Sequence, residues 1–529
     1  MKLKYLINIT ILLSLLFSDV RHRCPEYNAH NVRDDRPELE MYYESPSGHF
    51  WIHYDSATDD APDLTDIDFN GIPDYVEQVA LAADSARYVL TEQMGFINEN
   101  YDDDQKYDIY ILGLSPSLWG QTQYESSGSS FIKIRNSYEG MSNFCDNSND
   151  LMWLTVGHEF FHAIQYSYRT NSNDSYFREL SSMWFENIFV PDCYDFLEFV
   201  DMSSNSLFNS PENAFAYTTT GSYGYSLSLF GHYLSTIIDP EGEESQLNSN
   251  VIREVWENYS ENLSSTIFKS LKDVLEDNYD TSFSYAWSDF MTRNMFCGEL
   301  ENMSNDIYYH PGQSLIEPPD FSYESTLNVQ QNTYNLNIYS DRVSFLGFNA
   351  LENMSFYSTF SQTNNYLWYG LLSDDYIFNN LSGNDDFTNN DIAEQSKFFF
   401  ILMGDDNSNI DIEVSIDIEG CTDFYANNYS EFATIDDGSC IYRDRLTNPY
   451  PNPVNLENQS ISFDYIASNE TELSFSIVDL QGREISRKTF KNLSIGRNNI
   501  IISDLGYLAS GVYFILINDL ESLKFINIK

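Results

Sequence analysis

Two histidines four residues apart, with a glutamate directly after the first, form the pattern in this sequence best suited to chemistry. On a helix His158 and His162 fall on one face, so that one metal ion can bind both imidazoles. Glu159 stands where its carboxylate can reach a metal-bound water without binding the metal. Zinc lowers the pKa of such a water, and Glu159 can then take its proton. The pattern predicts a zinc-dependent hydrolase with Glu159 as general base.

A catalytic zinc site usually has a third protein ligand and one open position. The candidates that follow in the sequence are Glu179 and Glu186. They lie seven residues apart, which is about two helical turns, so both point to a similar face. The glutamate that does not bind zinc is expected to orient one of the histidines instead. The residues alone leave the two assignments open.

The elements that must position these residues are predicted by the hydrophobic pattern. Apolar residues surround the two histidines, as expected of a core helix, and a second helix carries both glutamates. Residues 107–112 are typical of a strand. Helical periods cover five segments, which are 74–91, 151–167, 177–189, 223–238 and 251–259. Helices mixed with strands indicate an α+β domain over residues 19–310.

The segments around the histidines and around Glu179 resemble the gluzincin metallopeptidases, the broad group that contains thermolysin. In that group the third ligand is a glutamate that begins a Glu-x-x-small pattern on a following helix, and Glu179 with Ser182 matches it. Sixteen residues separate His162 from Glu179, slightly fewer than in thermolysin-type enzymes. The resemblance implies a zincin-like catalytic domain, His158, His162 and Glu179 as zinc ligands, and a protein or peptide substrate.

The transition state of such a reaction needs a donor for the developing oxyanion. Related peptidases use a tyrosine or histidine from a later helix, and Tyr223, Tyr225 and His232 are the candidates here. We predict Tyr223 as the catalytic donor. In a chain with 39 tyrosines, however, packing inside a helix is the more common role of such residues.

Residues 66–77 fit a twelve-position calcium loop. Oxygen-bearing side chains occupy positions 1, 3, 5, 9 and 12, a glycine makes the turn at 6, and a backbone carbonyl binds at 7. The expected ligands are Asp66, Asp68, Asn70, Ile72, Asp74 and Glu77. Pro73 inside the loop is unlike calcium sensors and favours a structural role. The alternative is a solvated acidic turn.

The order of this loop, a Lys-Tyr-Asp-Ile-Tyr strand and a His-Glu-Phe-Phe-His-Ala-Ile-Gln helix is similar to that in a group of uncharacterised secreted bacterial metallopeptidases. The resemblance covers roughly residues 45–300. It implies a calcium-stabilised zinc endopeptidase.

Residues 1–18 have the pattern of a signal peptide. Lys2 and Lys4 precede a mostly apolar run that ends at Phe17 and is too short to span a bilayer comfortably. The rest of the sequence lacks a run of about 18 apolar residues, so we predict no transmembrane helix. The mature chain is therefore expected outside the cytoplasm.

Cysteine usage agrees with export, because disulfides persist in oxidising compartments. The chain has six cysteines, which are Cys24, Cys145, Cys193, Cys297, Cys421 and Cys440. Cys421 and Cys440 share a short module, residues 419–442, and are expected to pair. That module also offers Asp423, Asp436 and Asp437 as candidate calcium ligands. The other four cysteines allow three pairings, which the sequence leaves open.

The second half of the chain is predicted to be rich in strands. Period-two runs between Asn, Asp and Gly turns predict an all-β accessory domain, a β-sandwich, over residues 320–418. Residues 448–529 carry four ordered landmarks, which are Tyr450-Pro-Asn-Pro453, Ile477-Val-Asp-Leu-Gln-Gly-Arg483, Ser510-Gly-Val-Tyr-Phe514 and a terminal Lys529. These resemble the C-terminal sorting domain of the type IX secretion system of Bacteroidetes-type bacteria. The resemblance implies an Ig-like β-sandwich and export by that machinery.

The charge balance restricts the partners of this 529-residue chain. Against 81 Asp and Glu it has only 27 Lys and Arg, a formal charge of −54. That charge argues against nucleic acid as a partner and favours cation binding. We expect a secreted or surface-exposed monomer. The alternatives are a surface binding protein or adhesin with a non-catalytic metal site, and a zinc hydrolase that acts on non-peptide amides.

Overall fold

The computed structural model describes residues 36–529 with internal gaps. The gaps are 102–103, 116, 126, 142–144, 146, 218–220, 299–306, 324–330, 350–353, 361–364, 373–376, 382–386, 393–396 and 518–521. The predicted signal peptide and Cys24 lie outside the described residues. Within them, every helix is too short or too polar to cross a membrane.

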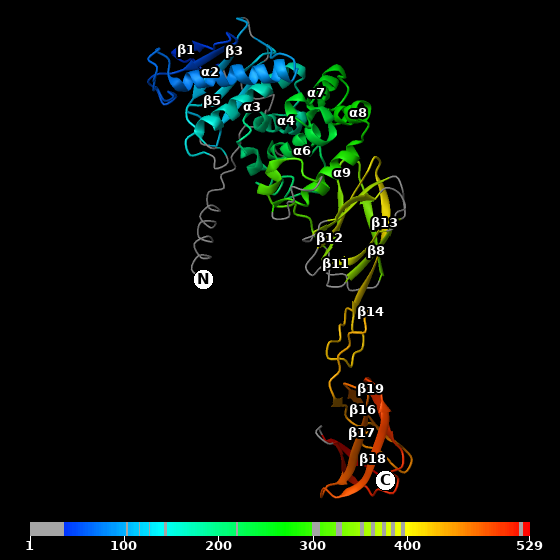
Figure 1. Cartoon of the computed structure of the whole chain (residues 1–529). Coiled ribbons are helices and arrows are strands. Elements are labelled where there is room, and N and C mark those ends of the chain that lie inside the picture. Colours follow the sequence, from blue (N-terminus) through cyan, green and yellow to red (C-terminus); the bar gives the residue numbers. More distant parts are fainter. Residues whose placement is uncertain are drawn as a thin grey trace.

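A mixed five-stranded sheet forms the first part of the chain (Figure 1). Its strands are β1 (Met41–Glu44), β2 (Phe50–Tyr54), β3 (Tyr107–Leu112), β4 (Gly120–Tyr124) and β5 (Ser130–Arg135). The order is β1-β2-β3-β5-β4, in which β2, β3 and β5 are parallel and the two edge strands are antiparallel to their neighbours. The strand predicted at 107–112 is confirmed.

The register of this sheet sets up one row of buried side chains. Ile52 lies opposite Ile109, Ile109 opposite Ile132, and Ile132 opposite Thr122 on the edge strand. Residues paired in this way point to the same face of a sheet. The three isoleucines are fully buried, so Thr122 ends an aliphatic row that faces the core.

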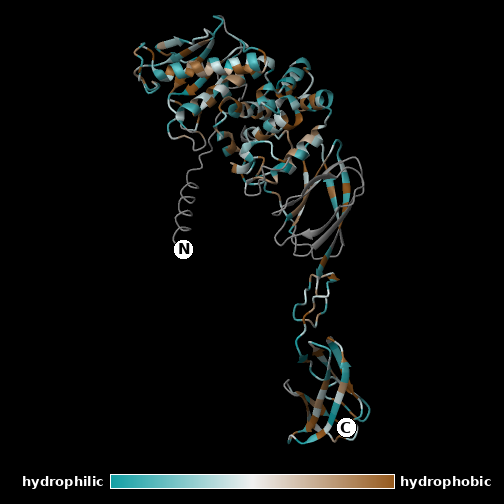
Figure 2. Cartoon of the chain, viewed as in Figure 1, coloured by the Kyte–Doolittle hydropathy of each residue, from teal (hydrophilic) through white to brown (hydrophobic). Residues whose placement is uncertain are grey.

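Three helices follow this sheet in the fold: the first two pack against it and against each other, and the third packs against the second. They are α2 (Asp74–Arg87, extended by a wider turn to Gln93), α3 (Ser148–Tyr168) and α4 (Ser175–Phe189). The valines and alanines of α2 are buried, and Figure 2 shows both apolar and polar residues along that helix. On α3, the ring of Phe160 lies 5.3 Å from that of Phe50 and 5.9 Å from that of Tyr107. Helix α3 is thereby fixed to the sheet.

Five further helices complete this α/β region. They are α5 (Gly221–Tyr225), α6 (Ser228–Tyr233, extended by a wider turn to Ile238), α7 (Val251–Glu261), α8 (Ile267–Tyr279) and α9 (Phe283–Asn294). The prediction of a single helix over 223–238 is wrong in one respect, because the helix is interrupted between α5 and α6. There Ser226 Oγ and Ser226 N both donate to the Tyr223 carbonyl, and Ser226 Oγ accepts from Leu207 N, so the backbone forms a turn.

The second half of the chain is rich in strands, as predicted. Two sheets of order β10-β9-β12-β7 and β11-β8-β13, with β6 beside β13, cover residues 331–420. The strands are β6 (Gln331–Ile338), β7 (Ser344–Asn349), β8 (Met354–Phe360), β9 (Asn365–Leu372), β10 (Ile377–Leu381), β11 (Phe387–Ile392), β12 (Lys397–Gly404) and β13 (Ser408–Gly420). Helix α9 packs against this region, where Ser288 Oγ accepts from Trp368 Nε1 at 2.7 Å.

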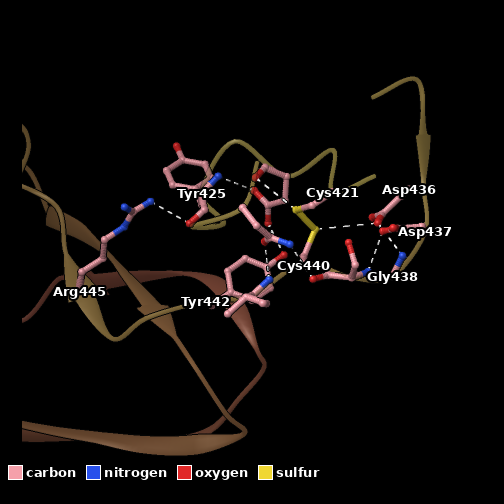
Figure 3. Close-up of a disulfide and its surroundings, with 12 residues drawn as sticks. Cys421, Tyr425, Asp436, Asp437, Gly438, Cys440, Tyr442 and Arg445 are labelled. Carbon is pink, nitrogen blue, oxygen red and sulfur yellow. Dashed lines mark hydrogen bonds between the residues drawn. A yellow bond between two sulfur atoms is a disulfide. The ribbon is translucent and has the colours of Figure 1, made fainter. Parts of the chain in front are cut away.

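A small module with little regular structure follows, and Figure 3 shows its disulfide. Cys421 pairs with Cys440, as predicted, and β14 (Ile435–Asp436) lies between them. The carboxylates proposed for calcium accept local hydrogen bonds, Asp436 from Gly438 N and Asp437 from Ser439 N. Calcium binding in this module stays a prediction.

The other described disulfide joins Cys145 to Cys193. It links the residues just before α3 to those just after α4, and so closes the segment that carries both helices. Cys297 is buried near the end of α9. Of the pairings that the sequence left open, the structure therefore forms Cys145 with Cys193.

A two-sheet β-sandwich ends the chain. Its sheets have the orders β15-β16-β19 and β18-β17-β20-β21, and Phe463, Phe475 and Phe525 lie in the core between them. The strands are β15 (Arg445–Leu446), β16 (Ile461–Ala467), β17 (Thr471–Asp479), β18 (Glu484–Leu493), β19 (Gly496–Ile502), β20 (Gly511–Ile517) and β21 (Leu523–Asn527). The chain as a whole combines an α/β part with a β-rich C-terminal part (Figure 1).

Candidate metal centre

Helix α3 begins at a side-chain cap and runs through the core. The Asn147 side chain accepts hydrogen bonds from the backbone N–H groups of Asn149 and Asp150, which would otherwise lack partners in the first turn. The central residues of α3 are mostly apolar, and they are buried around the helix. His158, Glu159 and His162 are consequently exposed by 4% or less.

The connection to α4 is held by arginines that bind backbone carbonyls. Arg169 donates to carbonyls of the loop that follows α7, including that of Leu263 at 2.8 Å. Arg178 donates to the Asn171 carbonyl at 2.7 Å. Helix α4 then packs along α3 and turns Glu179 and Glu186, seven residues apart, toward it.

Three ligand-type atoms converge between the two helices. His158 Nε2 lies 3.1 Å from His162 Nε2, and Glu179 Oε2 lies 3.3 Å from each of these nitrogens. In the described part of the chain, these three residues form the one group of His, Cys, Asp or Glu side chains whose ligand atoms lie close enough to one another to hold a metal ion. The sequence-predicted residues His158, His162 and Glu179 are thus brought together.

The triangle fits a tetrahedral metal. Zinc binds imidazole nitrogen and carboxylate oxygen at about 2.0–2.2 Å, so tetrahedral geometry separates its ligand atoms by about 3.3–3.6 Å. The observed sides of 3.1, 3.3 and 3.3 Å are close to that range. Two imidazoles also favour zinc or another transition metal over calcium or magnesium, which prefer oxygen ligands.

Glu186 occupies the other side of His158. Its Oε1 lies 2.8 Å from His158 Nδ1, and its side chain is fully buried. A carboxylate in this position accepts a hydrogen bond from Nδ1–H, so that Nε2 is the nitrogen that can bind a metal. The two glutamates between which the sequence could not choose therefore differ in position. Glu179 lies at the Nε2 atoms of both histidines, and Glu186 contacts His158 Nδ1.

Charge is concentrated in this buried site. Burial lowers the pKa of His158, but the carboxylates of Glu179 and Glu186 outweigh that effect and raise it to about 10. Burial raises the pKa of Glu179, yet the two imidazoles hold it well below the usual range. Glu179 is therefore ionised and His158 protonated near neutral pH when no metal is bound.

The edge strand β4 positions Glu159. The Thr122 hydroxyl lies 2.7 Å from both Glu159 Oε2 and the Glu159 carbonyl oxygen. A Cβ at Gly120 would lie 2.7 Å from Glu159 Cγ, so only a glycine allows the strand to come this close. The sequence analysis did not identify Thr122 or Gly120. Thr122 and Glu159 lie 37 residues apart in the sequence, and the register of β4 in the sheet brings them together.

The three candidates for the oxyanion donor lie in different surroundings. Tyr223 is buried, and its hydroxyl donates to the Ala214 carbonyl at 3.1 Å. His232 Nδ1 lies 2.8 Å from Gln246 Oε1, and burial lowers the pKa of His232 to about 4. The ring of Tyr225, by contrast, lies 6.3 Å from the ring of His158. The role of Tyr223 stays a prediction, and Tyr225 is the candidate whose ring lies near His158.

The predicted calcium loop gathers its carboxylates around Asn70. Asn70 Nδ2 donates to Asp68 Oδ2 at 3.0 Å and to Glu77 Oε1 at 2.8 Å, and Gly71 N donates to Asp66 Oδ2 at 2.9 Å. Gly71 has a φ of +93°, the conformation that a glycine adopts readily at a sharp turn. The remaining predicted ligands in the loop are Ile72 and Asp74, and Asp74 accepts weakly from Ile67 N.

Comparison with known families identifies the C-terminal sandwich. Residues 448–528 match the secretion system C-terminal sorting domain. This domain assigns the chain to type IX secretion, which exports it to the cell surface or the extracellular space. Strands β16–β21 of the sandwich therefore belong to the sorting domain, as the sequence landmarks implied.

Comparisons with curated proteins and solved structures are uninformative about function. No curated protein matches the chain. A Salmonella Typhimurium periplasmic inhibitor of g-type lysozyme is 11% identical and covers 18% of this chain and 99% of its own, with a TM-score of 0.15. A Bifidobacterium dentium β-glucuronidase is 10% identical over 35% of this chain and 38% of its own, with a TM-score of 0.12. Such low scores carry no functional inference.

The close approach of β4 to α3 gives a first prediction. Gly120→Ala should lower the melting temperature of the α/β part by several degrees, because Glu159 or the strand must shift, at a cost of about 1–3 kcal/mol. Differential scanning calorimetry measures this. Gly511→Ala is the control, since a Cβ there meets nothing nearer than 3.7 Å. Equal transitions for both variants and the wild type would contradict the contact.

Proposed function

We propose that this protein is a secreted zinc metallopeptidase with a zincin-like catalytic domain in its first 300 residues. The observation that carries the proposal is the triangle of His158 Nε2, His162 Nε2 and Glu179 Oε2, with sides of 3.1–3.3 Å. The neighbouring Glu159 carboxylate is the second half of the argument, because a hydrolase needs a base beside its metal. Export by the sorting domain suits an enzyme that acts outside the cell.

The residues around the triangle have distinct roles in this proposal. Bound zinc would supply Lewis-acid activation of a water molecule. Glu159 takes a proton from the attacking water and later delivers it to the leaving amine. The Thr122 hydroxyl, 2.7 Å from Glu159 Oε2, holds the carboxylate in position. Tyr225 donates to the oxyanion that develops as the tetrahedral species forms.

Replacement of the base is the direct test. Glu159→Gln should lower kcat/KM on casein-derived peptides by at least about 100-fold, because a general base contributes about 10²–10⁴ to the rate. Zinc content, measured by atomic absorption, should stay unchanged. Glu92→Gln, at an exposed carboxylate, is the control.

Two results would contradict the assignment. Full activity of the zinc-loaded Glu159→Gln protein would remove Glu159 as the base. A wild-type protein that binds no zinc and cleaves nothing in a chelator-sensitive way would favour a binding protein or adhesin.

Metal affinity should depend on pH. Because the pKa of His158 is about 10 without metal, a metal must displace a proton from this imidazole at neutral pH. The apparent affinity should therefore rise about tenfold per pH unit between pH 7 and 9 and level off as the pH approaches 10. Competition with a chelator of known pH dependence measures the slope, and an affinity that does not change with pH would contradict it.

We also propose that residues 66–77 bind one structural calcium ion. The support is the gathering of Asp66, Asp68 and Glu77 around Asn70 and Gly71, at the loop positions that supply calcium ligands. The predicted ligand set is unchanged, with Ile72 contributing its carbonyl oxygen. An ion there would fix the start of α2.

Calcium should then stabilise the wild-type chain but not a loop variant. At about 100 times its dissociation constant, calcium adds about 2.7 kcal/mol to the free energy of unfolding. Thermal melting with and without calcium should show this gain, and Asp66→Asn should abolish it. Asp63→Asn, which alters a carboxylate outside the loop, should keep it. Equal melting temperatures with and without calcium would contradict the site.

A further inference from the structure

Gln165 makes three polar contacts between the helices of the metal centre, and it is fully buried. Its Oε1 lies 2.9 Å from His162 Nδ1. Its Nε2 donates to the Arg178 carbonyl at 3.1 Å and to Ser182 Oγ at 3.2 Å. One amide on α3 thus contacts a histidine of its own helix and two acceptors on α4.

We propose that Gln165 is a positioning residue that fixes both the tautomer of His162 and the distance between His162 and Glu179. This proposal rests on the proposed zinc site. It adds a residue whose amide acts on two of the three ligands without contacting the metal.

The hydrogen-bond partners determine which way the amide points. A backbone carbonyl can only accept, so the group that faces Arg178 must be the NH₂ of Gln165. Its carbonyl oxygen is then left to face His162, and this oxygen can only accept a hydrogen bond. His162 Nδ1 must therefore carry a proton, and its Nε2, which lies 3.3 Å from Glu179 Oε2, is the nitrogen left for a metal.

The same amide also constrains the third ligand. Arg178 immediately precedes Glu179, so a hydrogen bond to the Arg178 carbonyl fixes the backbone from which the Glu179 side chain extends. Ser182, one turn further along α4, accepts the second N–H and lies 3.3 Å from His162 Nδ1. Gln165 consequently ties the second ligand to the third across the helix interface.

Charge explains why His162 Nδ1 meets the amide of Gln165, whereas His158 Nδ1 meets the carboxylate of Glu186. Three buried or nearly buried carboxylates, those of Glu159, Glu179 and Glu186, already surround the two imidazoles. A fourth would add an uncompensated buried charge and would face the Arg178 carbonyl oxygen without a proton to donate. A neutral amide satisfies His162 and both acceptors on α4.

Zinc affinity of the full chain, measured by competition with a chromogenic chelator, tests the proposal. Gln165→Met has a similar volume but no acceptor, and it should bind zinc about 10–100-fold more weakly, the usual effect of losing such a partner. Gln165→Asn keeps an amide that is too short to reach, and it should also weaken binding. Gln165→Glu keeps the acceptor for His162 but loses both donors to α4, so it should bind zinc more weakly than the wild type and more tightly than Gln165→Met.

The control is Gln313→Met, which removes another buried glutamine that accepts from the backbone of Tyr309 and His310. Its zinc affinity should equal that of the wild type. In the cobalt-substituted protein, the visible absorption bands should change in Gln165→Met and stay unchanged in Gln313→Met, because the bands report ligand geometry.

The outcomes separate this proposal from the zinc site itself. If the wild type binds no zinc, the proposed function fails. If the wild type binds zinc and both Gln165→Met and Gln165→Asn bind it equally well, only the role of Gln165 is overturned. Binding by Gln165→Glu as weak as that of Gln165→Met would also overturn it, because the acceptor at His162 would then be irrelevant.

Discussion

The approach of the Glu179 carboxylate to two imidazoles is the contact on which the rest of this site depends. A buried carboxylate is costly unless it is paired, and here the partners are His158 and His162 at 3.3 Å. That contact requires α4 to lie close against α3. Helix α5 also comes close to Glu179, since a Cβ at Gly224 would lie 2.9 Å from Glu179 Cβ. A bound metal would replace the proton of His158 as the positive charge that compensates this carboxylate.

Much of the site follows from the sequence because helix geometry alone relates His158, Glu159 and His162. The choice of Glu179 over Glu186 as the third ligand does not follow from the sequence. Both residues lie on one face of α4, and they differ in the imidazole nitrogen that each one contacts. The choice between Tyr223 and Tyr225 does not follow either, because the helix predicted over 223–238 breaks at Ser226. Thr122 depends on the register of β4 against β5, which no local pattern encodes.

The remaining parts of the chain suit a protein that works outside the cell. The sorting domain over residues 448–528 takes the chain through type IX secretion, and two disulfides lie in the described residues. One of them encloses the segment that carries both helices of the metal centre. The pattern of strands and turns predicted the β-rich half, whereas the pairing of Cys145 with Cys193 required the fold, because sequence spacing fits several pairings equally well.

X-ray absorption at the zinc edge, on the purified full-length protein and on its Glu179→Gln and Glu186→Gln variants, identifies the metal ligands. We expect one zinc with two imidazole nitrogens and at least one carboxylate oxygen at about 2.0–2.2 Å. The carboxylate should be lost in Glu179→Gln and kept in Glu186→Gln. No bound zinc, or loss of the carboxylate in Glu186→Gln instead, would contradict this ligand assignment.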